Sequence, residues 1–297
     1  MSDKSSHAPT PVGTFTSDLA CERRRVDLNT PGVEFKREES SGYVWERINI
    51  TTKEGEESIG RPIGTYDTLT LPRMDKLIDE DIYDAAEEVA RELCEICDKN
   101  LILPARILVV GLGNPNLTSD SIGPKSANLI NATMHIRNFN KDLFEGLECS
   151  EIAVCSPGVS ANSGMEASDI VMGLCEKIHP DVVFAIDALA AREASRLGKT
   201  IQFSDTGIFP GSGIGNTRAP LNKATLGAPV ISLGVPTVIS AEVFLIGDEE
   251  DERRRQRIKY LNRNTEGMFV SPKEIDGIVD ASAKIIARGI NQAFGIA

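Results

Sequence analysis

Short, uninterrupted apolar runs are the feature of this sequence that most restricts its fold. They recur through the middle of the chain between helical patterns, and they comprise Ile107–Val110, Ile152–Cys155, Val182–Ile186, Ile201–Phe203 and Val230–Leu233. A strand with one face in water alternates apolar and polar residues, whereas unbroken Val, Ile and Leu runs are typical of strands covered on both faces. We therefore predict an α/β fold, a three-layer sandwich with a mainly parallel central sheet.

The flanking regions add helices and a β-containing N-terminal extension to this sheet. Residues 41–50 and 68–71 are predicted strands, and apolar residues recur every three or four positions in 79–99, as on one face of a helix. A last helix is predicted to start with Ser271 as its N-cap, because Pro272 and Glu274 follow at the preferred positions. We expect a disordered segment over residues 1–20 and a single catalytic domain over 21–297.

Charge and composition exclude several classes of function. Acidic residues outnumber Lys and Arg by 44 to 32, which gives a net charge of −12 and disfavours direct binding of nucleic acid. We also expect no membrane association and a cytoplasmic location, because no apolar run approaches the roughly 20 residues of a membrane helix and the N-terminus lacks a signal-peptide core. The six cysteines are interpreted as buried apolar residues.

Few residues are suited to nucleophilic or metal chemistry. The chain has three histidines, His7, His135 and His179, so a Ser/His or Cys/His mechanism has little to draw on. Cys94 and Cys97 form a Cys-x-x-Cys pair, but no second pair has matching spacing, which favours packing over zinc or redox chemistry. We predict no metal site and no cofactor.

A glycine-rich turn follows the first apolar run. Gly111 and Gly113 let the backbone turn sharply, with Asn114 next and Asp120 further along. A dinucleotide fingerprint would place glycine at 116, where Asn116 stands. Asp120 has two open interpretations, as a helix cap or as a catalytic acid.

Asp187 follows another apolar run, and we predict that it ends that strand. It too is either a helix cap or a functional acid. Because both Asp120 and Asp187 follow strands, we expect them to meet in the crevice at the carboxyl edge of the sheet. Neighbouring carboxylates do not both ionise easily, so such a pair holds one proton and offers the acid and the base that amide hydrolysis needs. Which aspartate plays which role stays open.

A third glycine-rich stretch carries an Asp-Thr-Gly tripeptide. It occurs once, in an α/β context, which argues against the paired loops of pepsin-like enzymes. We expect its residues to line the crevice or to donate backbone N–H groups to an oxyanion. They are Asp205, Thr206, Gly207, Gly211 and Gly213.

Several of these segments closely resemble the germination protease family of endospore-forming bacteria. The resemblance is carried by Val109–Asn114 with Asp120, Ala185–Arg192, Ser204–Asn216, Leu226–Val238 and Val270–Asp276. It implies an endopeptidase of phosphorylase/hydrolase-like fold that degrades small acid-soluble spore proteins in the spore core. It places the proposed catalytic aspartates on Asp120 and Asp187, and it implies no metal.

The same resemblance implies a zymogen and a homotetramer. Family members lose a short N-terminal propeptide, and the stretch near their processing point is similar to Thr16, Ser17, Asp18, Leu19 and Ala20 here. Thr16 and Ser17 stand where Arg-Thr is usual, which leaves the cleavage position open.

Two other functions fit parts of the sequence. Gly111–Pro115 also resembles a stretch of peptidyl-tRNA hydrolase, which needs a crevice histidine and a basic RNA surface. Alternatively, the glycine-rich turns form a non-enzymatic nucleotide- or anion-binding module, in which the glycines matter and the two aspartates do not.

Overall fold

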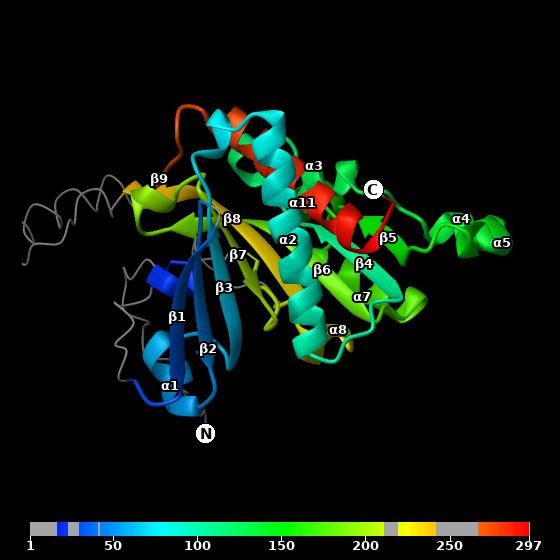
Figure 1. The fold of residues 1–297 in the computed structure, drawn as a ribbon, viewed down its shortest axis with the longest axis horizontal. Helices are drawn as coiled ribbons and strands as arrows, with labels where there is room; N and C mark the ends of the chain where they lie inside the picture. The colour runs from blue at the N-terminus through cyan, green and yellow to red at the C-terminus, as the bar shows by residue number, and fades with distance from the viewer. Residues whose placement is uncertain (1–16, 23–29, 41, 211–218, 242–266, 297) are drawn as a thin grey trace, which may run out of the picture.

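The computed structural model describes residues 17–22, 30–40, 42–210, 219–241 and 267–296. Within these ranges one nine-stranded sheet runs through the molecule in the order β1-β2-β3-β7-β8-β6-β4-β5, with β9 paired to β8 (Figure 1). The strands are β1 (Val33–Ser40), β2 (Tyr43–Ile50), β3 (Gly64–Thr70), β4 (Arg106–Gly111), β5 (Glu151–Cys155), β6 (Val182–Ala191), β7 (Thr200–Ser204), β8 (Val230–Ser240) and β9 (Phe269–Val270).

The sheet is mixed rather than mainly parallel. β8, β6, β4 and β5 are parallel neighbours, as the unbroken apolar runs predict. The Ile201–Phe203 run is also a strand, β7, but it pairs antiparallel with both β8 and β3. β1, β2 and β3 continue the antiparallel part, so the predicted extension belongs to the same sheet. The prediction of parallel strands is correct for four of the five apolar runs and wrong for Ile201–Phe203.

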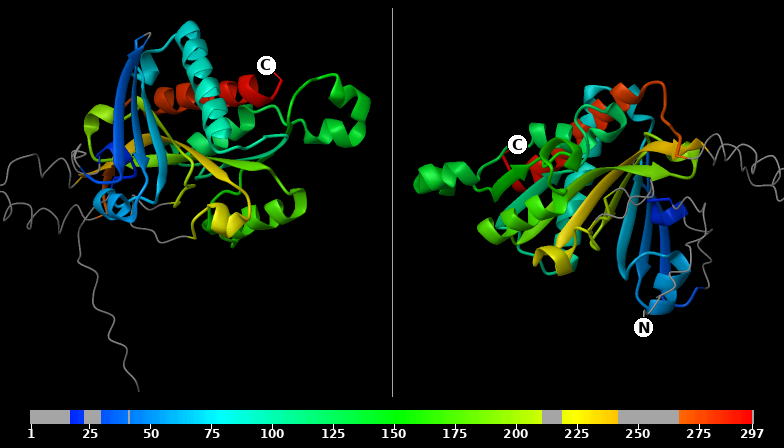
Figure 2. Two further views of the ribbon diagram at one scale, coloured as in Figure 1. Left: turned by 60° about the horizontal axis from the view of Figure 1, so that its bottom comes forward. Right: turned by 180° about the vertical axis from the view of Figure 1, so that it is seen from behind.

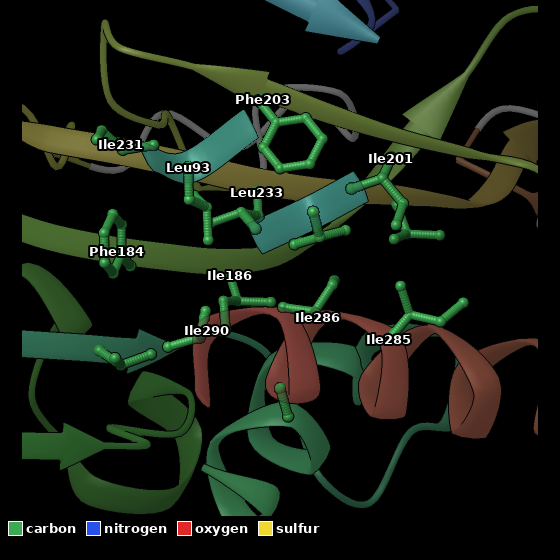
Figure 3. Close-up of a cluster of buried hydrophobic side chains, with 14 of the residues drawn as sticks. Leu93, Phe184, Ile186, Ile201, Phe203, Ile231, Leu233, Ile285, Ile286 and Ile290 are labelled. Carbon is green, nitrogen blue, oxygen red and sulfur yellow. The ribbon is translucent and has the colours of Figure 1, made fainter. Parts of the chain in front are cut away.

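Helices pack on both faces of the parallel half. β-strand side chains alternate between faces, so Phe184 and Ile186 of β6 point toward α11 (Ile275–Phe294), as Figure 3 shows. Val183 and Ala185 point the other way, into a core that contains Val171 of α7 (Ala167–Ile178). α2 (Asp79–Lys99) and α3 (Ile122–Leu129) lie with α11, whereas α8 (Lys223–Leu226) lies with α7 (Figures 1 and 2). The shorter helices are α1 (Lys53–Ile59), α4 (Met134–Phe139), α5 (Lys141–Glu145) and α6 (Ser160–Ser163).

The two long helices test the sequence patterns at their ends. α2 has the predicted bounds, and its predicted apolar face is buried. α11 begins at Ile275, one turn later than predicted from Ser271. The Glu274 carboxylate accepts a hydrogen bond from Arg73 at 2.9 Å, so this side chain is held by the loop before α2. None of the described helices is both long and apolar enough to cross a membrane.

Candidate active site

Asp187 lies inside β6, not at its end as predicted. β4 stays in register with β6 only to the Gly111–Ile186 pair, but β8 pairs with β6 as far as Ala191, and this support prolongs the strand. Asp187 therefore lies in a part of β6 that is paired with β8 but no longer with β4. It is 6% exposed, and its Oδ1 accepts the Ala188 backbone N–H at 2.9 Å.

Asp120 is positioned by the glycine-rich turn after β4. It ends a short 3-10 turn, Thr118–Asp120, and its Oδ2 accepts the Asn114 backbone N–H at 2.8 Å. Gly113 has φ of +114°, and a Cβ there would lie 2.0 Å from the Asp120 carbonyl oxygen, so only glycine fits. The cap position of α3 belongs to Ser121. The Asp120 carboxylate thus holds the turn rather than the helix.

The two aspartates line the same pocket, as the strand positions predict. The pocket is acidic: Asp18 is a third carboxylate in its wall, and Arg61 is the one cation among the described lining residues. No described histidine reaches it. Other walls come from Pro62, Tyr66, Leu112, Gly113, Leu117, Ser119, Gly158, Ala188, Leu189, Ala190, Gln202, Ser204, Thr206, Gly207, Ile208, Phe209, Ser232, Gly234, Thr237 and Phe269.

The other predicted loop residues divide into pocket walls and supports. Gly113, Thr206 and Gly207 line the pocket. Gly207 has φ of +84° and approaches the Leu221 carbonyl too closely for any side chain. Thr206 shares a hydrogen bond with the Tyr66 hydroxyl at 3.1 Å.

Asp205, Gly111 and Asn114 are not among the pocket walls. The Asp205 carboxylate accepts the Thr65 N–H at 2.8 Å and thereby ties this loop to β3. Gly111 allows α3 to approach β4, since a Cβ would lie 2.2 Å from the Gly123 carbonyl oxygen. Asn114 contributes its backbone N–H to Asp120. Gly211 and Gly213 lie outside the described residues.

The N-terminal segment Ser17–Glu22 packs into the site. The prediction of disorder is wrong for residues 17–20, because Ser17, Leu19 and Ala20 are buried. The Ala20 N–H donates to the Gln202 side chain at 2.7 Å. Thr16 lies outside the described residues, so its place relative to the pocket stays a prediction. The sequence predicts Asp18 only as part of the processing region and not as a pocket wall, because a single carboxylate in a polar segment carries no periodic signal.

Glu22 anchors the far end of this segment. Its buried carboxylate accepts the backbone N–H groups of Arg192, at 2.6 Å, and Glu193, at 2.9 Å, beyond the end of β6. The Ser17 hydroxyl donates to the same carboxylate. Burial raises the pKa of Glu22, while these hydrogen bonds oppose the rise.

The prediction of buried cysteines is confirmed for Cys97 and Cys175, whereas Cys21, Cys94, Cys149 and Cys155 are only partly buried. All six are free, and burial raises the pKa of the Cys97 thiol to about 12, which suits packing rather than nucleophilic chemistry. Within the described ranges no three or more His, Cys, Asp or Glu side chains are arranged to hold a metal ion. His179 is the C-cap of α7 in the left-handed conformation, and it is not among the described pocket walls.

Comparison with known proteins gives a consistent result. The family model described as germination protease matches residues 16–248. The germination protease of Caldanaerobacter subterraneus subsp. tengcongensis is 35% identical over 93% of this chain and 93% of its own length. That of Clostridium acetobutylicum is 36% identical over 96% of this chain and 94% of its own, and that of Bacillus pumilus is 33% identical over 93% and 92%.

Among solved structures, a [NiFe] hydrogenase maturation protease, HycI, from Thermococcus kodakarensis aligns with 56% of this chain and 93% of its own, at 18% identity and a TM-score of 0.30. The sequence matches extend over nearly the whole chain and include both pocket aspartates, Asp120 in the turn after β4 and Asp187 in β6. This chain therefore belongs to the germination protease family.

Proposed function

We propose that this protein is an aspartic-type endopeptidase that hydrolyses small acid-soluble spore proteins during germination, using water activated by Asp120 and Asp187. Family membership supports a peptidase that acts in spore germination. The observation that carries the mechanism is that two carboxylates from separate segments, the turn after β4 and the strand β6, line one pocket.

The surroundings of the two acids suit shared protonation. Asp187 is almost fully buried, and burial disfavours a charged carboxylate. Asp18 adds further negative charge to the same pocket, whereas Arg61 supplies one positive charge. A pair that holds a single proton provides a base to deprotonate water and an acid to protonate the leaving nitrogen. The pair acts as a unit, so neither residue is assigned one role.

The glycine turns at Gly113 and Gly207 form pocket walls beside the acids. In this mechanism their backbone N–H groups face the carbonyl oxygen of the scissile amide as it gains charge. The chemistry needs neither metal nor cofactor, because the two carboxyl groups supply both proton transfers.

We further propose that the chain is a zymogen that assembles as a homotetramer in the spore-core cytoplasm, with residues 21–297 as one catalytic domain. The packing of Ser17–Glu22 against β6 supports a processing point upstream of Asp18, because removal of Asp18 and Ala20 would take away the partners of Ala190 and Gln202.

The competing functions fit the pocket less well. A peptidyl-tRNA hydrolase-like mechanism needs a histidine, and the described walls contain none. An anion-binding module needs positive or N–H-rich surroundings, whereas three carboxylates face this pocket.

The test replaces each aspartate by the isosteric amide. Asp120→Asn and Asp187→Asn should each lower kcat/KM for a purified small acid-soluble spore protein by about a thousandfold or more, because an amide neither accepts the proton of water nor returns it. Unchanged circular dichroism and unfolding midpoint would show that the fold is intact. Wild-type cleavage by either folded variant would defeat the proposal.

A further inference from the structure

The edge of β6 that faces away from β8 has two different neighbours, β4 before Asp187 and the N-terminal segment after it. The Leu112 N–H donates to the Ile186 carbonyl oxygen at 2.8 Å, and this is where the pairing with β4 ends. Backbone groups alternate in direction along a strand, so the N–H and C=O of Ile186, Ala188 and Ala190 all point away from β8. The edge beyond Ile186 faces the pocket, which Ala188, Leu189 and Ala190 all line.

Farther along this edge the chain already places a short segment, Ser17–Leu19, on β6. The Asp18 N–H donates to the Ala190 carbonyl oxygen at 3.0 Å, and the Ala190 N–H donates to the Asp18 carboxylate at 2.9 Å. Arg61 fixes the same segment by donating to the Ser17 carbonyl oxygen at 2.9 Å. A backbone N–H from another part of the chain therefore reaches this edge of the strand and donates to it.

Between these two attachments lies Ala188. Its N–H is taken by the Asp187 carboxylate at 2.9 Å. Among the described residues, no group outside the β6–β8 pairing donates a hydrogen bond to the Ala188 carbonyl oxygen. A strand edge that offers a carbonyl to a pocket is a site for strand addition, in which main-chain hydrogen bonds give the affinity.

We propose that the segment to be cut binds as a short added strand on β6 at Ala188, donating one backbone N–H to the Ala188 carbonyl oxygen. This inference rests on the proposed function and identifies how the same site holds its substrate. An added strand lies about 4.8 Å from β6, which brings its backbone alongside the carboxylate of the adjacent residue, Asp187. The hydrogen bond thus fixes the position of one substrate amide relative to Asp120 and Asp187.

The space along the edge sets what can bind. Ile186 and Ala190 are four residues apart, about 13 Å of strand, and both are already paired. The added strand is therefore only about three residues long, and it must be extended and locally unfolded. A helix or a folded domain cannot present its backbone to this edge.

The experiment removes single backbone N–H groups from a peptide. The probe is a short synthetic peptide that covers the cleavage point of a purified small acid-soluble spore protein, located by mass spectrometry. One series replaces each amide outside the scissile bond by an ester, and a second series methylates each nitrogen. Affinity for full-length Asp120→Asn is measured by fluorescence anisotropy, and kcat/KM is measured with the unsubstituted enzyme.

The expected result is a loss of affinity confined to one position of the peptide. One position should lose about tenfold or more in affinity with the ester, because the Ala188 carbonyl is left without a donor, while the adjacent positions change little. N-methylation at the same position should lower the affinity by at least as much. The reduction should appear in kcat/KM as well.

A flat response to both series, or no binding of the parent peptide, would overturn the added strand. Stronger binding of the peptide only after deletion of residues 1–16, with a flat ester series, would show that the chain itself occupies the edge and would also overturn it. The proposed function fails separately, since it depends on whether Asp120→Asn and Asp187→Asn stop cleavage.

Discussion

Two pairs of carboxyl groups lie on opposite faces of the same sheet, in opposite surroundings. Asp120 and Asp187 line a pocket on the side of α7. Asp67 of β3 and Glu92 of α2 are fully buried on the side of α2, where the Arg47 guanidinium is 2.8 Å from each carboxylate. Two adjacent acids are therefore not enough to indicate catalysis. Access distinguishes the two pairs, because the first lines a pocket whereas the second is closed around the Arg47 guanidinium.

Protonation is favoured at the buried pair. Burial, followed by the hydrogen bond with Glu92 and its negative charge, raises the pKa of Asp67 to about 7, although Arg47 opposes the rise. Arg47 is itself fixed by its two carboxylates and by the Trp45 ring, whose centroid lies 4.7 Å away. This cluster joins β2, β3 and α2, so we assign it a structural role.

The largest effect should come from removing the guanidinium. Arg47→Met leaves Asp67 and Glu92 buried without their counterion, and we expect about 3–5 kcal/mol loss of unfolding free energy. Urea denaturation measures it, with exposed Arg37→Met on β1 as the matched control. The folded fraction should still cleave substrate within a few-fold of wild type, in contrast to Asp187→Asn. Loss of cleavage without loss of stability would mean that the cluster of Arg47, Asp67 and Glu92 has a role in catalysis rather than in the fold.

The second effect is a pH dependence that belongs to Asp67. Since its pKa is raised in the folded state, the folded protein binds a proton that the unfolded chain releases above about pH 4. The contribution of Asp67 to stability should therefore be greatest at low pH, fall as pH rises toward about 7, and level off above it. Glu22 also has a raised pKa, so the wild-type slope alone is ambiguous.

Asp67→Asn isolates the contribution of the pair. The difference in unfolding free energy between variant and wild type should change by about 3 kcal/mol between pH 4.5 and 7.5, with the wild type losing more as pH rises. Urea midpoints at a series of pH values provide the measurement. Parallel curves for the two proteins would show that Asp67 does not carry the proton.

Sequence patterns predict the two pairs unequally. The apolar runs that precede Gly111 and Asp187 predict that Asp120 and Asp187 lie near the same sheet edge. Both acids line one pocket, which confirms that they lie together. No such pattern marks Asp67 and Glu92, because they meet only through the packing of α2 on an antiparallel sheet. The order of β7 and β3 and the docking of Asp18 on β6 depend on the same long-range contacts. Local spacing therefore predicts the elements and the strand-end acids, but not the partners that tertiary packing supplies.

The smallest effect tests the aromatic side of the buried cluster. The Trp45 Nε1–H donates to the Glu88 carboxylate at 3.1 Å, and the ring stacks on Arg47. Trp45→Phe keeps an aromatic ring but loses the donor and weakens the cation–π contact, so we expect about 1 kcal/mol loss of stability. Tyr83→Phe is the control, because Tyr83 is exposed and keeps its ring beside Arg288. Equal unfolding midpoints for the two variants would show that Arg47 is held by its carboxylates alone, which would reduce the cluster to an ion-pair network between the sheet and α2.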